Sequence, residues 1–197
     1  MVTVSPDLVR VESELSAGRL LCPSCDGGVL APWAWARERL VGRGRRLERV
    51  RPRRARCRAC GVTHVLLPTT MLVRRGDWAE VIGRALELKA AGAGQRPIAV
   101  TVGVSRSTVR GWLARFAVVA ERVRAHLTRW ALWLDPGLVR FEPSDDPLGD
   151  AAAAVAAAGA AAAERLGISC HWQFASAATG GRLLANTTSP FPGPWMG

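Results

Sequence analysis

The chain has 197 residues, enough for one domain or two small ones, and carries a net charge of +11. That charge favours a polyanionic partner, first nucleic acid and second an acidic membrane surface. The longest apolar run, residues 151–163, is too short and too alanine-rich to span a bilayer, and residues 1–20 lack the pattern of a signal peptide. We therefore expect no membrane attachment and a cytoplasmic, nucleoid-associated location, where cysteines are metal ligands or buried thiols rather than disulfides.

Composition and periodicity predict a mainly α fold with a small β zinc ribbon. An Ala-rich helix is expected near the C-terminus because alanine is the strongest helix former. The expected segments are an N-terminal arm or short helix (1–20), a zinc ribbon with an Arg-rich hairpin (21–67), a three- or four-helix unit with an extended last helix (77–134), an acidic, Pro-rich linker (135–150), and the Ala-rich helix with an irregular tail (151–197).

The ribbon prediction rests on two C-x-x-C pairs separated by 31 residues, Cys22 with Cys25 and Cys57 with Cys60. Two thiolate pairs can close a tetrahedral zinc site, and four thiolates leave no open position for catalysis. We expect one structural zinc ion, which would supply on the order of 10 kcal/mol to the folding of this lobe. A redox pair, which needs a βαβ context that is absent here, and unrelated buried cysteines are the alternatives. His64 is redundant as a fifth ligand and is expected to be an ordinary strand residue.

The residues between the two cysteine pairs are strongly basic. Eleven arginines and two glutamates lie between Arg37 and Arg58. An arginine-rich hairpin or loop is therefore expected here, and a rigid cationic surface of this kind suits backbone phosphate. The arginines expected to contact phosphate are Arg51, Arg53, Arg54 and Arg56. Trp33 and Trp35 leave an RNA-binding ribbon open as an alternative, since exposed aromatic rings stack on unpaired bases.

Helical periodicity begins after residue 76. Asp77 and Glu80 have the spacing of a capping box, and glycines 92 and 94 can end the helix that follows. Pro97 is tolerated in the first turn of the next helix, Gly103 can make a left-handed turn, and Ser105 can cap a third helix. The small Ala99 lets two helices cross closely.

The stretch QRPIAVTVGVSRSTVRGWLARF, residues 95–116, resembles a helix-turn-helix motif. Residues 20–134 resemble the zinc-ribbon plus helix-turn-helix proteins of actinobacteria, which are related to the N-terminal DNA-binding region of insertion-sequence transposases; CRACGVTHVLLP followed by a linker and WAEVI is the characteristic stretch. The resemblance implies double-stranded DNA as the partner, with the third helix in the major groove. The base contacts that it implies are Ser105, Arg106, Ser107 and Arg110, and the phosphate contacts are Gln95, Arg96, Thr108 and Arg115, beside the arginines near the second cysteine pair.

An apolar stripe continues beyond Phe116 through Val119 or Ala120, Val123, Leu127, Trp130 and Leu134. Either one long helix runs out of the motif or a further helix folds back within residues 111–120. Such a stripe is core more often than a dimer seam, but a homodimer stays open because single helix-turn-helix units usually bind DNA in pairs.

No constellation of residues indicates an enzyme. Transposases cleave DNA with carboxylates on a nuclease sheet, whereas the acids of this chain gather in the linker without strands around them. These acids are Asp135, Glu142, Asp145, Asp146 and Asp150. We expect no catalytic residue and no small-molecule substrate, and a regulator or a transposase-derived DNA-binding protein without a catalytic core. An adaptor that docks a protein partner through residues 151–197 is the remaining alternative.

Overall fold

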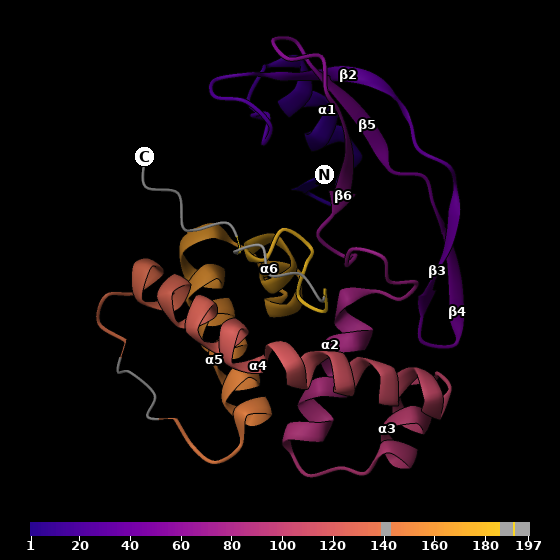
Figure 1. The fold of residues 1–197 in the computed structure, drawn as a ribbon, viewed down its shortest axis with the longest axis vertical. Coiled ribbons are helices and arrows are strands. Elements are labelled where there is room, and N and C mark those ends of the chain that lie inside the picture. The colour runs from indigo at the N-terminus through magenta and orange to yellow at the C-terminus, as the bar shows by residue number, and fades with distance from the viewer. Residues whose placement is uncertain (139–142, 186–190, 192–197) are drawn as a thin grey trace.

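The structure is a computed structural model, and it describes residues 1–138, 143–185 and 191. The fold is mixed α/β: an N-terminal sheet region holds the four cysteines, and a helical region follows it (Figure 1). The β content exceeds the small ribbon that was expected because the first residues of the chain add a strand to its sheet. Glu142 and the end of the tail lie outside the described residues.

The ribbon sheet has four strands in the order β1-β6-β5-β2. The strands are β1 (Val2–Val4), β2 (Leu30–Trp35), β5 (Arg53–Cys57) and β6 (Thr63–Pro68), and only the β1–β6 pairing is parallel. Helix α1 (Leu8–Ser16) packs Val11 and Leu15 into the core of this sheet. The segment expected as an N-terminal arm is therefore part of the ribbon, as a strand and a helix.

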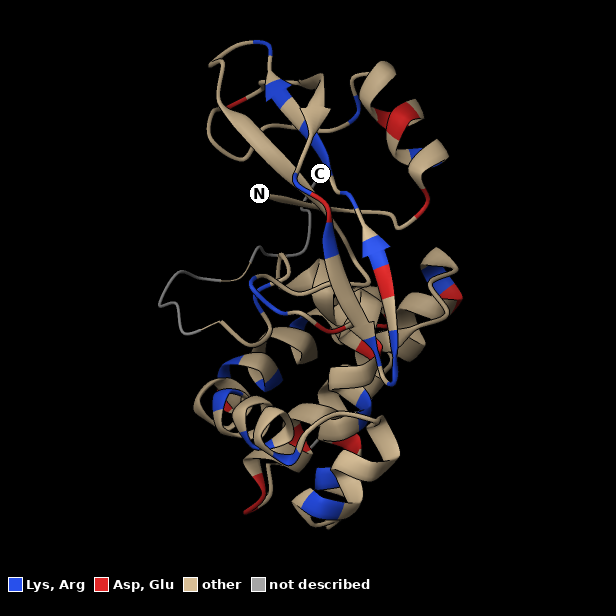
Figure 2. Ribbon diagram, turned by 90° about the vertical axis from the view of Figure 1, so that its right-hand side faces the viewer, with Lys and Arg blue, Asp and Glu red and all other residues tan. Residues whose placement is uncertain are grey.

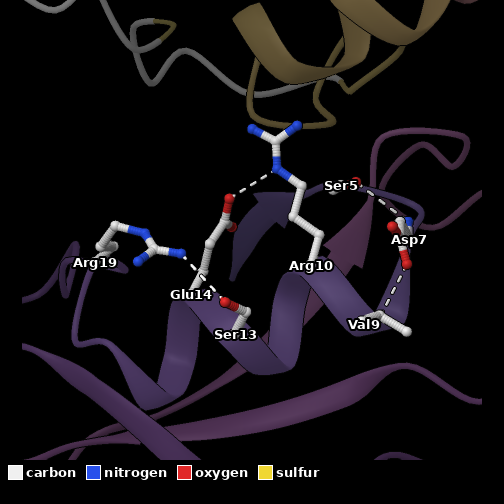
Figure 3. Close-up of polar contacts among 7 residues, drawn as sticks. All are labelled: Ser5, Asp7, Val9, Arg10, Ser13, Glu14 and Arg19. Atoms are coloured by element: carbon white, nitrogen blue, oxygen red, sulfur yellow. Dashed lines mark hydrogen bonds and ion pairs between the residues drawn. The ribbon is translucent and has the colours of Figure 1, made fainter.

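Helix α1 begins where Asp7 caps it, because the Asp7 carboxylate accepts the backbone N–H of Val9 at 2.9 Å (Figure 3). On its outer face, Arg10 forms an ion pair with Glu14 at 2.9 Å, one turn further along. These contacts are local and exposed, so the two buried residues of α1 contribute more to its attachment.

The arginine-rich segment forms the expected hairpin, made of β3 (Arg39–Arg43) and β4 (Arg46–Val50). Its two-residue turn has Gly44 first, at φ 65°, a position that favours glycine. In Figure 1 the hairpin extends from the ribbon sheet along one edge of the molecule to the helices. It thereby brings the basic segment beside the helical region.

The helical region starts with α2 (Ala79–Ala90), α3 (Gln95–Val102) and α4 (Arg106–Leu134). Gly103 joins α3 to α4 in the left-handed conformation at φ 72°, and Ser105 caps α4 by accepting the backbone N–H of Thr108 at 3.1 Å, as expected. The expected capping box at the start of α2 is wrong. Trp78 occupies the N-cap position without a side-chain hydrogen bond, and Asp77 instead lies against β3.

Helix α4 is one continuous helix, and its apolar stripe is core. It packs along α5 (Pro147–Leu166), with α6 (His171–Ala178) beside both. Val123, Leu127 and Trp130 are at most 6% exposed. A homodimer would therefore need a surface other than this stripe. Within the described residues, no single helix is long and apolar enough to span a membrane, and α5 with α6 reaches that length only across a 94° bend.

Helix α5 begins at Pro147, inside the segment expected as a linker. The Asp150 carboxylate accepts two hydrogen bonds from Ser144, at 2.7 Å from the backbone N–H and 2.8 Å from the hydroxyl. In the tail, α6 packs Trp172 and Phe174 against the helices and is more ordered than the irregular segment that was expected.

Candidate metal centre and basic surface

The four predicted cysteines converge at one end of the ribbon sheet. Their sulfur atoms all lie within 4.8 Å of one another, with 3.8 Å between Cys22 and Cys60 and 3.6 Å between Cys25 and Cys57. Four sulfurs bound at about 2.3 Å around a tetrahedral ion are about 3.8 Å apart. The cluster therefore has the size of a four-thiolate zinc site and can hold one metal ion.

Backbone N–H groups in both C-x-x-C loops point at the sulfurs. The N–H of Ser24 lies 3.4 Å from Cys22 Sγ, and the N–H of Cys60 lies 3.4 Å from Cys57 Sγ. The latter contact lowers the pKa of the Cys57 thiol to about 6, because an N–H donor favours the thiolate. Sulfur contacts, first with Cys60, raise the pKa of Cys25 to about 12. A cation bound among the sulfurs would favour the thiolate form of each ligand.

Gly28 lies directly against the sulfur atoms of this cluster. A Cβ at this position would lie 2.5 Å from Cys25 Sγ and 2.7 Å from Cys57 Sγ, so only glycine leaves room for the four sulfurs. The sequence contains this glycine, but its spacing to the ligands is not part of the C-x-x-C pattern, and we did not predict its role.

His64 lies in β6, as expected, but its ring touches the cluster. Nε2 is 3.5 Å from Cys22 Sγ, and Nδ1 is 3.2 Å from the amino group of Met1. Burial lowers the pKa of His64, which favours a neutral ring that can donate one N–H to the sulfur. The histidine therefore belongs around the metal site rather than in its ligand set.

The arginines predicted to contact phosphate near the second cysteine pair form hydrogen bonds within the ribbon, but Arg53 and Arg54 are only half-buried and the other two are exposed. Arg53 donates to Glu12 at 2.6 Å and lies over Trp35, while Arg56 donates to the carbonyl of Gly61 at 3.2 Å. Arg54 donates to Thr63 at 3.0 Å, and Arg51 is exposed. The pattern of arginines did not indicate these partners, because Glu12 is 41 residues from Arg53 and Thr63 lies on the next strand of the sheet.

The residues predicted to contact DNA in α3 and α4 lie at the starts of the two helices, except Arg115. Arg106, Ser107 and Arg110 are exposed in the first two turns of α4, and Gln95 and Arg96 begin α3. The Ser105 hydroxyl is used by the helix cap and also lies 2.8 Å from the Thr108 hydroxyl. Arg115 is half-buried and donates back to the carbonyl of Gly111 at 2.8 Å.

Three further arginines lie at the hairpin end beside these helices and were not among the predicted contacts. Arg43, Arg45 and Arg46 are exposed around the β3–β4 turn, and Figure 2 shows basic residues at this end of the hairpin, next to the helices. The only sequence signal for their placement is the glycine turn, which predicts a hairpin tip but not what the tip touches.

Other titratable groups lie where α6 meets α2. His171 and Trp172 both donate to Glu87, at 2.6 and 2.7 Å, and thereby attach α6 to α2. The Cys170 thiol has a raised pKa because of burial. Among the described residues, the cysteine quartet alone gathers three or more metal-ligating side chains closely enough to hold an ion.

Comparison of the chain with protein-family models, with curated proteins and with solved structures found no match. The metal centre and the basic surface therefore have to be interpreted from their own chemistry.

Proposed function

We propose that the chain is a zinc-stabilised protein that binds double-stranded DNA through the start of α4 and has no catalytic activity of its own. The observation that carries the proposal is the α3–α4 corner. Gly103 turns the chain in a left-handed conformation, the small Ala99 is buried where the helices meet, and Arg106 and Arg110 project from the first two turns of α4. This arrangement supports the proposal because a helix-turn-helix motif needs a tight turn, a small residue at the helix crossing and an exposed second helix.

The start of α4 would enter the major groove. Arg106 and Arg110 are spaced one helical turn apart, so both guanidinium groups can face the same groove and bind guanine O6 and N7. Ser107 adds an exposed hydroxyl, while Ser105 holds the helix cap and orients the first turn. Gln95 and Arg96 at the start of α3 can bind the adjacent phosphates. The role would be that of a transcriptional regulator or a transposase-derived DNA-binding protein.

The test uses a random-sequence pool of fluorescein-labelled duplexes of about 20 base pairs, with affinity measured by fluorescence anisotropy and preference by selection from the pool. R106A and R110A should each lose about 1–3 kcal/mol of binding free energy on the selected duplex and relax its base preference. The control is R10A/R165A, which removes two exposed arginines from α1 and the end of α5. Unchanged affinity and preference in R106A and R110A would contradict the proposal.

A second candidate function is RNA binding by the ribbon, which two tryptophans favour. Trp33 is 55% and Trp35 is 42% exposed, and Arg56 and Arg53 lie over their rings at 5.0 Å. An open pocket beside Trp33 is lined by Arg56 and the second C-x-x-C loop. An unpaired base could stack there. Competition of the labelled duplex by single-stranded RNA, single-stranded DNA and duplex DNA shows which nucleic acid the protein prefers. If the ribbon binds RNA, W33A should weaken single-strand binding and leave duplex binding unchanged.

A further inference from the structure

The β3–β4 hairpin is fastened to the helical region near its tip. The N–H of Gly42 donates to the carbonyl of Gly76 at 2.7 Å, and the N–H of Trp78 donates to the carbonyl of Gly42 at 2.9 Å. Next to these bonds, Val41 is fully buried, and the Arg43 guanidinium lies 4.6 Å from the centre of the Trp78 ring. The tip is therefore fixed relative to α2 rather than free in solvent.

The tip meets the turn between α3 and α4 through backbone contacts. A Cβ added to Gly44 would lie 3.1 Å from the carbonyl oxygen of Val102. A Cβ added to Gly103 would lie 2.7 Å from Arg45 Cγ and 3.1 Å from the Arg45 nitrogen. Two glycine turns from distant parts of the sequence thus pack on each other. The hairpin tip lies next to Gly103, just before α4 begins at Arg106.

The tip carries positive charge that the rest of the protein leaves available. Arg45 and Arg46 are exposed, and no ion pair involves either of them among the described residues. Arg43 forms an ion pair with Glu48 at 3.5 Å, and an exposed ion pair of this length contributes little to stability. The Arg53 guanidinium, in contrast, is held by Glu12 within the ribbon, while Arg56 is exposed, donates to the carbonyl of Gly61 and lies over Trp33.

We infer that the hairpin tip is a second DNA-binding element, in which Arg45 and Arg46 bind backbone phosphates of the duplex that receives the start of α4. The inference rests on the proposed function and adds a site to it. Guanidinium groups bind phosphate with paired N–H donors, and a contact to phosphate adds affinity and fixes the position of the protein without reading sequence. The phosphate contacts predicted for Arg51, Arg53, Arg54 and Arg56 stay a prediction, and the hairpin tip adds two exposed arginines nearer to α4.

The experiment measures the affinity of wild-type protein, R45A/R46A, R106A/R110A and the control R10A/R165A for the labelled duplex pool between 50 and 200 mM salt. Two lost phosphate contacts reduce the slope of log affinity against log salt by about 1.8. The affinity advantage of wild type over R45A/R46A should therefore shrink about 12-fold between the two salt concentrations. The salt slope of the control R10A/R165A should be closer to that of wild type than the slope of R45A/R46A is. R45A/R46A should keep the base preference selected from the pool.

Each outcome bears on the inference. If wild type binds duplex and R106A/R110A weakens it, but R45A/R46A has the slope of the control, the hairpin inference is overturned while the proposed function stands. If R45A/R46A weakens binding of an RNA hairpin and leaves duplex DNA unchanged, the ligand class is wrong. If wild type does not bind duplex DNA, both are overturned. Thermal unfolding measured by circular dichroism checks that every variant retains the wild-type fold.

Discussion

Replacing Gly28 by alanine should open the metal centre. The new Cβ would lie 2.5 Å from Cys25 Sγ and 2.7 Å from Cys57 Sγ, whereas unbonded atoms of this kind pack at about 3.5–4.0 Å. Two ligand sulfurs would have to move by about 1 Å, and a zinc site tolerates only about 0.2 Å in its ligand distances. Changes outside the ligand set already cost 10–100-fold in metal affinity, so we expect a loss of about 100-fold or more.

The adjacent Gly27 provides the matched control. Its φ of +67° strains an alanine by about 1–2 kcal/mol, but nothing lies within 4 Å of the added Cβ. G27A should therefore lose stability and keep its zinc affinity. Competition with a chromophoric chelator measures the affinity, and elemental analysis should find about one zinc per wild-type chain. Equal zinc affinities in G28A and wild type, or an equal loss in G27A, would refute the steric reasoning.

Two further predictions concern the helical core. Alanine in place of a helical glycine normally stabilises a helix by about 1 kcal/mol, but a Cβ on Gly83 would lie 2.1 Å from the ring of Trp172. G83A should therefore lower the free energy of unfolding, measured in urea, by about 1–3 kcal/mol. A rise in this free energy would contradict the packing of α6 on α2. The second concerns His126, whose pKa is lowered by burial. Nε2 lies 2.8 Å from the carbonyl of Ala178, and Nδ1 is buried without a hydrogen-bond partner among residues 1–138, 143–185 and 191, so a second proton finds no acceptor there. Since the unfolded state takes up that proton first, stability should be full above about pH 6.5 and fall as the pH drops toward the folded pKa, and urea unfolding of H126Q should show a smaller loss between pH 7 and 5.5 than wild type.

The features predicted well from sequence are those that depend on local chemistry. Cys22, Cys25, Cys57 and Cys60 were recognisable because thiolate pairs at this spacing have few uses other than metal binding. The left-handed turn was recognisable because Gly103 interrupts an apolar pattern at the position where such a turn is required. In both cases the residue types and their spacing along the chain carry the signal, although the fold brings the two cysteine pairs together.

The features that sequence did not predict depend on contacts between distant residues. Asp77 has the spacing of a helix cap, but in the structure it pairs with Gly42 of β3. Trp78 therefore occupies the N-cap position of α2. Arg53 looked available for phosphate because its partner Glu12 is 41 residues away. The sequence gives the number of arginines in a segment. Only the fold determines which of these arginines form ion pairs with acids or hydrogen bonds with carbonyls.

Helix α5 shows the same limit for apolar surface. Its sequence predicted a helix, but a run of alanines has little periodicity to indicate a buried face. In the structure Ala154, Ala158 and Ala162 are buried in the same core as Val123 and Leu127, and these small side chains let α5 pack closely along α4. The second half of α4 is therefore held along its length within the chain. Because α4 is continuous, this packing also fixes the direction of its first turns, where the proposed base contacts lie beside the hairpin tip.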